Sequence, residues 1–142
     1  MREGFPTVAV VGATGAVGRE ALAILASRGW PSSRVGAFAS ARSTGLRAPF
    51  GLGALPVHAF GARSCDGYDI ALFCADGETA TRHAVEAAAS GAVVVDNSAA
   101  FRMDPHTPLV VPEVHGEYPA GWACKHPARG VIANPNCSTV MR

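Results

Sequence analysis

The sequence predicts a doubly wound α/β fold, with a mostly parallel sheet and helices on both faces. Three observations lead to this prediction. Several short runs are apolar throughout, as expected of strands buried on both faces. Helical patterns of apolar residues follow some of these runs, and strands and helices alternate along the chain, which is typical of crossover units in a parallel sheet. A glycine-rich turn after the first strand makes the predicted fold Rossmann-like.

The composition is that of an ordinary globular domain. The chain has 142 residues, of which 49% are apolar and 16% charged, and its formal net charge is +1. We find no basic stripe that would indicate nucleic acid and no apolar run near the roughly 18 residues of a membrane span. The N-terminus lacks the apolar region of a signal peptide, so we expect a cytoplasmic protein with neither a nucleic-acid nor a membrane partner.

Residues 7–11 form the first predicted strand, and a glycine turn over residues 12–18 leads into a helical pattern over residues 17–28. The residues at helical spacing are Val17, Ala21, Leu22, Ile24, Leu25 and Arg28. Gly15 and Gly18 keep side chains out of the turn, so a pyrophosphate can approach the amides at the start of the helix. The order of strand, glycine turn and helix therefore predicts a dinucleotide site. The alternative is a structural turn without a ligand.

The second predicted strand, residues 35–39, indicates which dinucleotide is bound. A site for NAD usually places Asp or Glu about 20 residues beyond the glycines. This chain instead has Ser40, Arg42 and Ser43 there, with no acid nearby. An arginine and hydroxyl groups suit a 2′-phosphate, so we expect NADP. The alternative is that Arg42 is a solvated loop residue.

The middle of the chain contains one uncertain segment and two clear elements. We expect residues 45–67 to be irregular, with residues 55–60 as an edge strand, because Pro56 argues against a central one. Residues 69–74 read as a buried strand and residues 78–90 as an alanine-rich helix.

The cysteines and histidines of the chain indicate no metal site. The four cysteines have no zinc-type spacing, and we expect them to be thiols. Cys74, at the end of a strand, is expected to be a small buried filler. His83 is expected to be an exposed helix residue.

Two further strands bring polar residues to the same edge of the sheet. Residues 92–98 form a buried strand ending in Asp96-Asn97-Ser98, and residues 131–133 form a short last strand before Asn134. Because ligands of open parallel sheets bind at the carboxyl ends of the strands, the polar end of the first of these strands is expected to face the crevice of the glycine turn.

The segment after the last strand carries a candidate nucleophile. Cys137 follows Asn134-Pro135-Asn136 and precedes Ser138, where a helix could begin, and helix amides favour a thiolate. About one turn of that helix is present, which is too short to be stable alone. We therefore expect residues 134–142 to be frayed.

Five phrases in order resemble the aspartate-semialdehyde dehydrogenase family. They are Val11-Gly12-Ala13-Thr14-Gly15-Ala16-Val17-Gly18, Ser40-Ala41-Arg42-Ser43, Asp96-Asn97-Ser98-Ala99-Ala100-Phe101-Arg102-Met103-Asp104, Val111-Pro112-Glu113-Val114 and Asn134-Pro135-Asn136-Cys137-Ser138-Thr139. The resemblance runs from the first strand to the last residue.

The resemblance implies an NADP-dependent oxidoreductase of lysine, threonine and methionine biosynthesis. It would interconvert aspartate 4-semialdehyde plus phosphate with 4-aspartyl phosphate. Cys137 would be the nucleophile, with Asn136 beside it, and Arg102 would bind phosphate. The cofactor turn would be lined by Gly12, Thr14, Gly15, Ala16 and Val17, and the 2′-phosphate held by Ser40, Arg42 and Ser43.

The residues agree with this chemistry. A thiolate can attack an acyl phosphate and form a thioester that accepts hydride from a nicotinamide. Amides after Cys137 or the Asn136 side chain could stabilise the oxyanion, and Arg102 could grip phosphate with two donors. The alternative for Arg102 is a surface salt bridge to Asp104.

The resemblance also implies that part of the enzyme is not in this sequence. Residues 1–133 would be the NADP-binding domain and residues 134–142 the truncated start of a catalytic domain, whose histidine, substrate-binding arginine and oligomer interface would follow. The full-length protein is expected to be a homo-oligomer, and the 142-residue fragment to be inactive alone. His115 and the acidic turn at residues 75–78 depart from the family pattern.

Two alternatives remain open at this point. One is an N-acetyl-glutamyl-phosphate reductase, which has similar architecture and thiol chemistry, although that family tends to have glycine before its cysteine. The other is a binding module that holds NADP and catalyses nothing.

Overall fold

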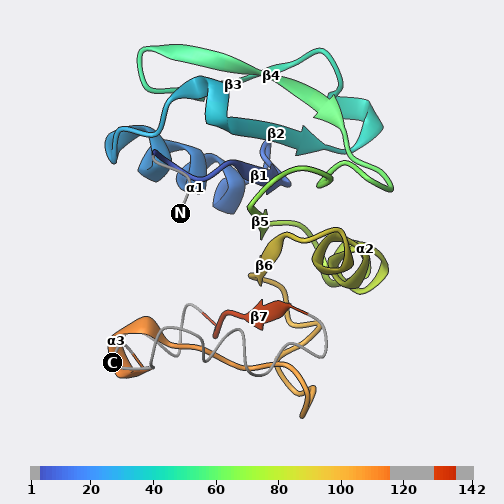
Figure 1. The fold of residues 1–142 in the computed structure, drawn as a ribbon. Helices are drawn as coiled ribbons and strands as arrows, with labels where there is room; N and C mark the ends of the chain where they lie inside the picture. The colour runs from blue at the N-terminus through green and yellow to red at the C-terminus, as the bar shows by residue number, and fades with distance from the viewer. Residues whose placement is uncertain (1–3, 116–129, 137–142) are drawn as a thin grey trace.

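The computed structural model describes residues 4–115 and 130–136. Within these residues the strands form one seven-stranded sheet in the order β3-β4-β2-β1-β5-β6-β7. Figure 1 shows α1 on one face of the sheet and α2 on the other. The strands are β1 (Val8–Val11), β2 (Val35–Ala39), β3 (Arg47–Phe50), β4 (Gly53–Ala59), β5 (Ile70–Phe73), β6 (Val93–Asp96) and β7 (Val131–Ala133), and the helices are α1 (Ala16–Ser27), α2 (Gly77–Ala89) and the short α3 (Pro112–His115), with 3-10 turns η1 (Ser32–Arg34) and η2 (Ala41–Ser43).

The predicted fold class is confirmed. All pairings between named strands are parallel except that of β3 with β4. The central strand, β1, pairs with β2 on one side and β5 on the other, and all four of its residues are buried. The uninterrupted apolar run at residues 8–11 is therefore a strand with both faces covered.

The structure corrects the predictions for residues 45–67. They include a hairpin, and its second strand, β4, lies between β3 and β2 rather than at an edge. Pro56 is tolerated because Val57 donates its N–H toward β3, to the carbonyl of Leu46 at 2.9 Å. Successive residues of a strand alternate their N–H directions, so Pro56 faces β2, where pairing begins only at Val57.

The apolar face predicted for α1 is only partly buried. Leu22 and Leu25 pack into a core cluster with β1, β2 and the β3–β4 hairpin. Val17 and Ile24, which the helical pattern also placed on this face, are 54% and 44% exposed. These two side chains remain exposed because their side of α1 borders a hollow next to β5, where no other described element packs against them.

On the opposite face, α2 packs closely against β5, β6 and β7. Its buried residues are Ala80, Ala84 and Ala87, whose small side chains let the helix approach the sheet. The prediction that His83 is simply exposed is wrong. Its ring packs edge-on against Phe60, with 5.1 Å between ring centroids, and its side chain is 28% exposed.

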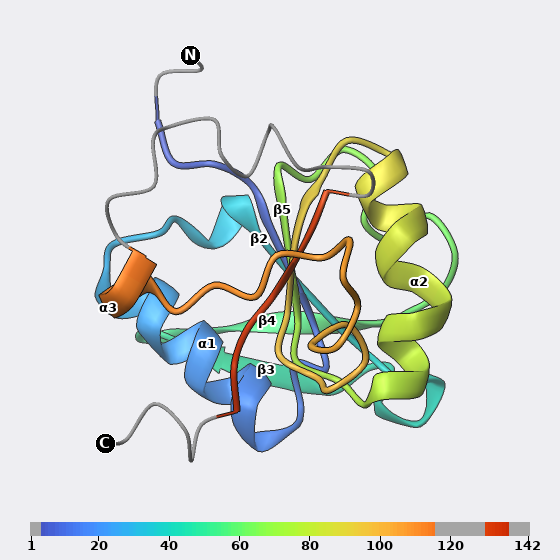
Figure 2. The same ribbon diagram turned by 90° about the horizontal axis from the view of Figure 1, so that it is seen from below.

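The two halves of the sheet are covered differently. Leu72, Val95 and Ile132 are register partners on the α1 side, and each is only half-buried. On the same face of the sheet, Val93, the register partner of Ile70, is 44% exposed. Figure 2 shows α1 and α2 on opposite sides of the strands. Among the described helices, none covers this half of the α1 face, although parallel sheets are usually covered on both faces.

Candidate functional site

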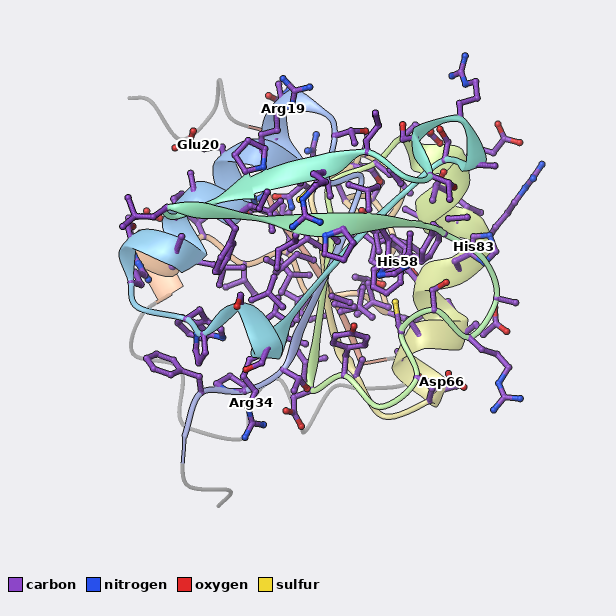
Figure 3. The ribbon with its side chains drawn as sticks, turned by 90° about the horizontal axis from the view of Figure 1, so that it is seen from above. Arg19, Glu20, Arg34, His58, Asp66 and His83 are labelled. Carbon is purple, nitrogen blue, oxygen red and sulfur yellow. The ribbon has the colours of Figure 1, made fainter. Side chains whose placement is uncertain are left out.

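The candidate site lies at the carboxyl ends of the parallel strands. The turn after β1 is tied to β2, because the amides of Gly12 and Ala13 donate to the carbonyl of Phe38 at 2.8 and 2.9 Å. Figure 3 shows Arg19, near the start of α1, at this end of the molecule and Arg34, which precedes β2, at the other. The strand ends after β1, β2, β5, β6 and β7 therefore share one edge.

The three glycines of the turn have different roles. Gly12 has a φ of +86°, and a Cβ there would lie 2.5 Å from the carbonyl oxygen of Cys74. A Cβ on Gly18 would collide with the carbonyl of Gly12. A Cβ on Gly15 would meet nothing nearer than the Gly12 oxygen at 3.4 Å. The fold thus requires Gly12 and Gly18, whereas Gly15 leaves open space beside the helix.

Among the described residues, the start of α1 has no side-chain cap. Gly15 is the N-cap residue, no side chain caps the helix, and its first turn contains no acid. Ala16 and Val17, the first two residues of the helix, are exposed. Helix N-termini carry unsatisfied amides and a partial positive charge, so this end can take a phosphate. Thr14, in the same turn, is half-buried.

The residues predicted to hold a 2′-phosphate follow β2. Ser40 and Arg42 are exposed and Ser43 is half-buried in the single turn η2. The ion pairs found among the described residues do not involve Arg42. Its guanidinium is therefore available to an external anion at the same edge of the sheet.

A hollow of about 450 Å³ adjoins the start of α1. Two residues that line this hollow, Ala16 and Val17, were predicted as part of the cofactor turn. Cys74 and Asn97 also line it but were not predicted as site residues. The signal for Asn97 was present, because polar residues end the strand at residues 92–98 and were expected to face this crevice. The lining residues are Ala16, Val17, Glu20, Ala21, Ile24, Leu72, Cys74 and Asn97.

Cys74 is less enclosed than the predicted buried filler, because it is half-buried and lines the hollow. Burial raises the pKa of its thiol to about 11, which the Asn97 amide at 3.7 Å from Sγ partly opposes. Burial likewise raises the pKa of Cys65 to about 11. Both shifts favour the neutral thiol near neutral pH, which argues against a nucleophilic role for either residue.

Arg102 contacts two backbone carbonyls. Its Nε donates to the carbonyl of Asn134 and its Nη2 to that of Asn97, each at 2.9 Å. The carboxylate of Asp104, the predicted alternative partner, accepts from the amide of His106 and the hydroxyl of Thr107, both at 2.9 Å. Two of the five guanidinium N–H donors are thus engaged at the ends of β6 and β7.

The segment that carries the candidate nucleophile is described only in part. Asn134 donates its amide to the carbonyl of Asp96 at 2.8 Å, Pro135 is buried and Asn136 is exposed. The predicted fraying therefore does not begin at Asn134, because bonds to the end of β6 fix this residue. Cys137 and the rest of residues 137–142 lie outside the described residues.

A mostly parallel sheet with a glycine turn and an open helix N-terminus at its carboxyl edge defines a nucleotide-binding α/β domain. Comparison with protein families makes this class specific. Residues 7–120 match the family model described as the semialdehyde dehydrogenase NAD binding domain. The chain belongs to this family.

Relatives extend the resemblance over nearly the whole chain. It is 47% identical over 134 residues to an aspartate-semialdehyde dehydrogenase of Synechocystis, covering 94% of this chain and 38% of the relative. An enzyme of the same name from Bacillus subtilis is 46% identical over 134 residues, covering 94% and 37%. The chain thus spans less than two fifths of the length of these relatives.

Solved structures agree. The chain resembles the aspartate semialdehyde dehydrogenase II of Vibrio cholerae complexed with ASA, with a TM-score of 0.84 and 40% identity over 96% of this chain and 44% of that one. A likeness in fold alone extends to the Candida albicans enzyme with NADP, at a TM-score of 0.64 and 24% identity over 96% and 44%. Over the described ranges, no helix has the length and apolar character needed to cross a membrane.

Proposed function

We propose that this chain is the NADP-binding portion of an aspartate-semialdehyde dehydrogenase. The observation that carries the proposal is the 47% identity to such an enzyme over 94% of the chain. Because the chain covers 38% of that relative, the activity belongs to the longer polypeptide. Its substrates would be 4-aspartyl phosphate in one direction and aspartate 4-semialdehyde with phosphate in the other, in a homo-oligomer located in the cytoplasm.

The cofactor would lie across the carboxyl edge of the sheet. The turn from Gly12 to Val17 would receive the pyrophosphate at the open start of α1, where no acid opposes it. Ser40, Arg42 and Ser43 would hold the 2′-phosphate. The exposed guanidinium of Arg42 supports this role, as does the presence of NADP in the Candida albicans structure. When bound, NADPH supplies the hydride of the reaction.

Cys137 would provide the nucleophile. Its thiolate would attack the carbonyl carbon of the acyl phosphate, forming a C–S bond while the C–O bond breaks and phosphate leaves. Asn136 would donate to the developing oxyanion, and the free donors of Arg102 would bind the departing phosphate. Residues 1–133 would then serve the cofactor, and the catalytic domain would begin at residues 134–142.

The test uses the full-length polypeptide that carries this chain. Aspartate 4-semialdehyde, phosphate and NADP should produce NADPH, followed by its absorbance, and the Cys137→Ala variant should lose this activity. Turnover of N-acetylglutamate semialdehyde instead would favour the alternative reductase. Cofactor binding without turnover of either aldehyde would favour a non-catalytic module, an alternative raised by the partial coverage of the relatives.

Cofactor choice is tested separately. Arg42→Ala should weaken NADPH binding about tenfold or more while leaving NADH binding nearly unchanged, because only NADPH has the 2′-phosphate that a guanidinium can pair with. Arg34→Ala, at the opposite end of the sheet, serves as the control. Equal affinities of the unaltered protein for NADPH and NADH would contradict the assignment of Arg42.

A further inference from the structure

Three residues join the ends of β5, β6 and β7, and we call Asn97, Arg102 and Asn134 the edge brace. We propose that Arg102 is a positioning residue. Through this brace it fixes the segment that leads to Cys137 against the hollow beside α1. This inference rests on the proposed function for its catalytic consequence, but the brace itself consists of hydrogen bonds among described residues.

The first step is the connection between β6 and β7. Arg102 is part-buried and follows β6, and its two donors reach the carbonyls of Asn97 and Asn134, which are 37 positions apart in sequence. The planar guanidinium can serve two acceptors at once in a fixed geometry. Arg102 therefore adds a side-chain link between the residues that directly follow β6 and β7.

The second step is the side-chain pair within the brace. The Asn134 amide group donates to Oδ1 of Asn97 at 2.7 Å. Asn97 in turn donates from Nδ2 to the carbonyl of Phe73, the last residue of β5, at 3.2 Å. Both ends of the Asn97 side chain are thus engaged. Because Asn97 also lines the hollow beside α1, the brace fixes one wall of that hollow.

The third step is the anchoring of the loop that carries Arg102. Asp96 is fully buried and accepts from Ser98, from its amide at 3.0 Å and its hydroxyl at 2.7 Å. The Ser98 hydroxyl oxygen accepts from the amide of Ala100 at 3.1 Å. These bonds hold the chain between β6 and Arg102 in one conformation, so the guanidinium is presented to its carbonyls by a fixed loop.

The fourth step is the short distance along the chain to the nucleophile. Cys137 is three residues after Asn134, a span of at most about 11 Å of extended chain. Asn134 is held by Arg102 at its carbonyl, by Asn97 at its side chain and by Asp96 at its amide. The base of the Cys137 segment is therefore fixed relative to the cofactor wall, and small displacements of reacting groups can cost large factors in rate.

This role differs measurably from a grip on phosphate. Lysine retains the positive charge but has one nitrogen, which cannot reproduce two donors in a planar fork. The test compares Arg102→Lys and Asn134→Ala in the full-length polypeptide, with Arg34→Lys as the matched control. Hydrogen exchange is measured on peptides covering residues 95–103 and 130–136, and the rate of Cys137 alkylation is measured against pH without phosphate. Enzyme kinetics separate kcat from the KM for phosphate.

We expect Arg102→Lys to speed exchange in both peptides, to alter the pH profile of Cys137 alkylation and to lower kcat about tenfold to a hundredfold at saturating phosphate. Asn134→Ala should change all three in the same direction by less, and Arg34→Lys should change none. A rise in the KM for phosphate with unchanged exchange and alkylation would overturn the proposal, as would faster exchange without a change at Cys137. If the unaltered protein does not turn over the semialdehyde, the proposed function fails, and exchange and alkylation still decide whether the brace positions Cys137.

Discussion

The N-termini of α1 and α2 lie at the same edge of the same sheet but are capped differently. Gly15 caps α1 without a side-chain hydrogen bond and with no acid in the first turn. Asp76 caps α2 by accepting from the amide of Thr79 at 2.8 Å, and Glu78 follows in its first turn. The first amides of α1 thus have no side-chain acceptor among the described residues, whereas α2 supplies one for the amide of Thr79 from its own sequence.

The difference indicates which of two equivalent positions is better suited to bind an anion. Both helices follow a buried strand and point their positive ends at the crevice, so fold alone does not distinguish them. The carboxylates of Asp76 and Glu78 already occupy the positive end of α2, and a phosphate there would meet like charge. We therefore expect an anion to bind at the start of α1 rather than at the start of α2, and changes at the two caps test this expectation.

The largest effect is expected from the glycines that the fold itself needs. Gly12→Ala or Gly18→Ala places a Cβ against backbone, and at Gly12 also forces alanine into a φ of +86°. Each change should lower the free energy of unfolding by about 2 kcal/mol or more, measured by chemical denaturation. Gly15→Ala is the matched control, because its Cβ meets the nearest oxygen at 3.4 Å. An equal loss for Gly15→Ala would contradict the division of roles.

Gly15→Asp should make α1 resemble α2. The new carboxylate can cap the helix, so the thermal midpoint should be unchanged or higher. NADPH binding should weaken about a hundredfold or more, because like charges placed together cost several kcal/mol. Gly15→Asn adds the cap without the charge and should weaken binding less. Unchanged NADPH affinity in Gly15→Asp would move the pyrophosphate away from α1.

Cys74 lies between the two helix starts, and its thiol should remain neutral in the crevice. Burial raises the pKa of this thiol from its ordinary value of 9.0 to about 11, so its contribution to stability is present below pH 9 and is lost as the pH rises through about 11. Alkylation at pH 8 should therefore be slow at Cys74 and at Cys65, read by mass spectrometry of the labelled peptides. Cys74→Ala should reduce the loss of stability between pH 9 and 11. Rapid labelling of Cys74 at pH 8 would contradict its assignment as a filler.

Asp76→Gly removes the side-chain cap of α2 and should make its start resemble that of α1. We expect a lower thermal midpoint, since the amide of Thr79 loses its acceptor, and NADPH affinity within about threefold of the original. Asp76→Asn should retain the cap and the midpoint. A large gain in NADPH affinity on Asp76→Gly would show that this carboxylate repels a cofactor phosphate, and the comparison of the two caps would then need revision.

The smallest effect is the pH dependence of the α2 cap. The hydrogen bond from the backbone of Thr79 lowers the pKa of Asp76 below 3.8. Its contribution to stability is therefore fully present above pH 3.8 and fades as the pH falls through the lowered value. As the pH falls through this range, the thermal midpoint of the original protein should decrease relative to that of Asp76→Asn. A constant difference across this range would mean that the cap does not depend on the charge.

Much of the scaffold could be predicted because its signals are local. The run ending at Val11 is a buried strand, and β2 and β7 have the predicted bounds. The segment predicted at residues 69–74 is also a strand, but Ile70 and Leu72 are only half-buried. The β3–β4 hairpin could not be predicted in the same way. Pro56 argues against a central strand locally, yet it is accommodated because the register with β2 begins one residue later.

The candidate site divides in a similar way. The glycine turn and Arg42 were found from residue type and spacing, and both lie at the carboxyl edge, whereas Cys137 lies outside the described residues. The carbonyl bonds of Arg102 could not be found, because residue type says nothing about a partner 32 positions away. Helical spacing put Val17 and Ile24 on the apolar side of the helix. It gives no information on whether another element covers that side, and in the structure the adjoining part of the sheet is only half-covered.

The sequence by itself determined the order of β1, α1, β2, β5, α2, β6 and β7 along the chain, the family and the chemistry that its motifs imply. These depend on apolar period, glycine placement and residue type along a short stretch of chain. The tertiary structure alone decided which glycine is free for a ligand, which helix start is open, and that Arg102 joins Asn97 to Asn134. These depend on distances between segments far apart in the chain, and such distances exist only once the parallel strands have set their register.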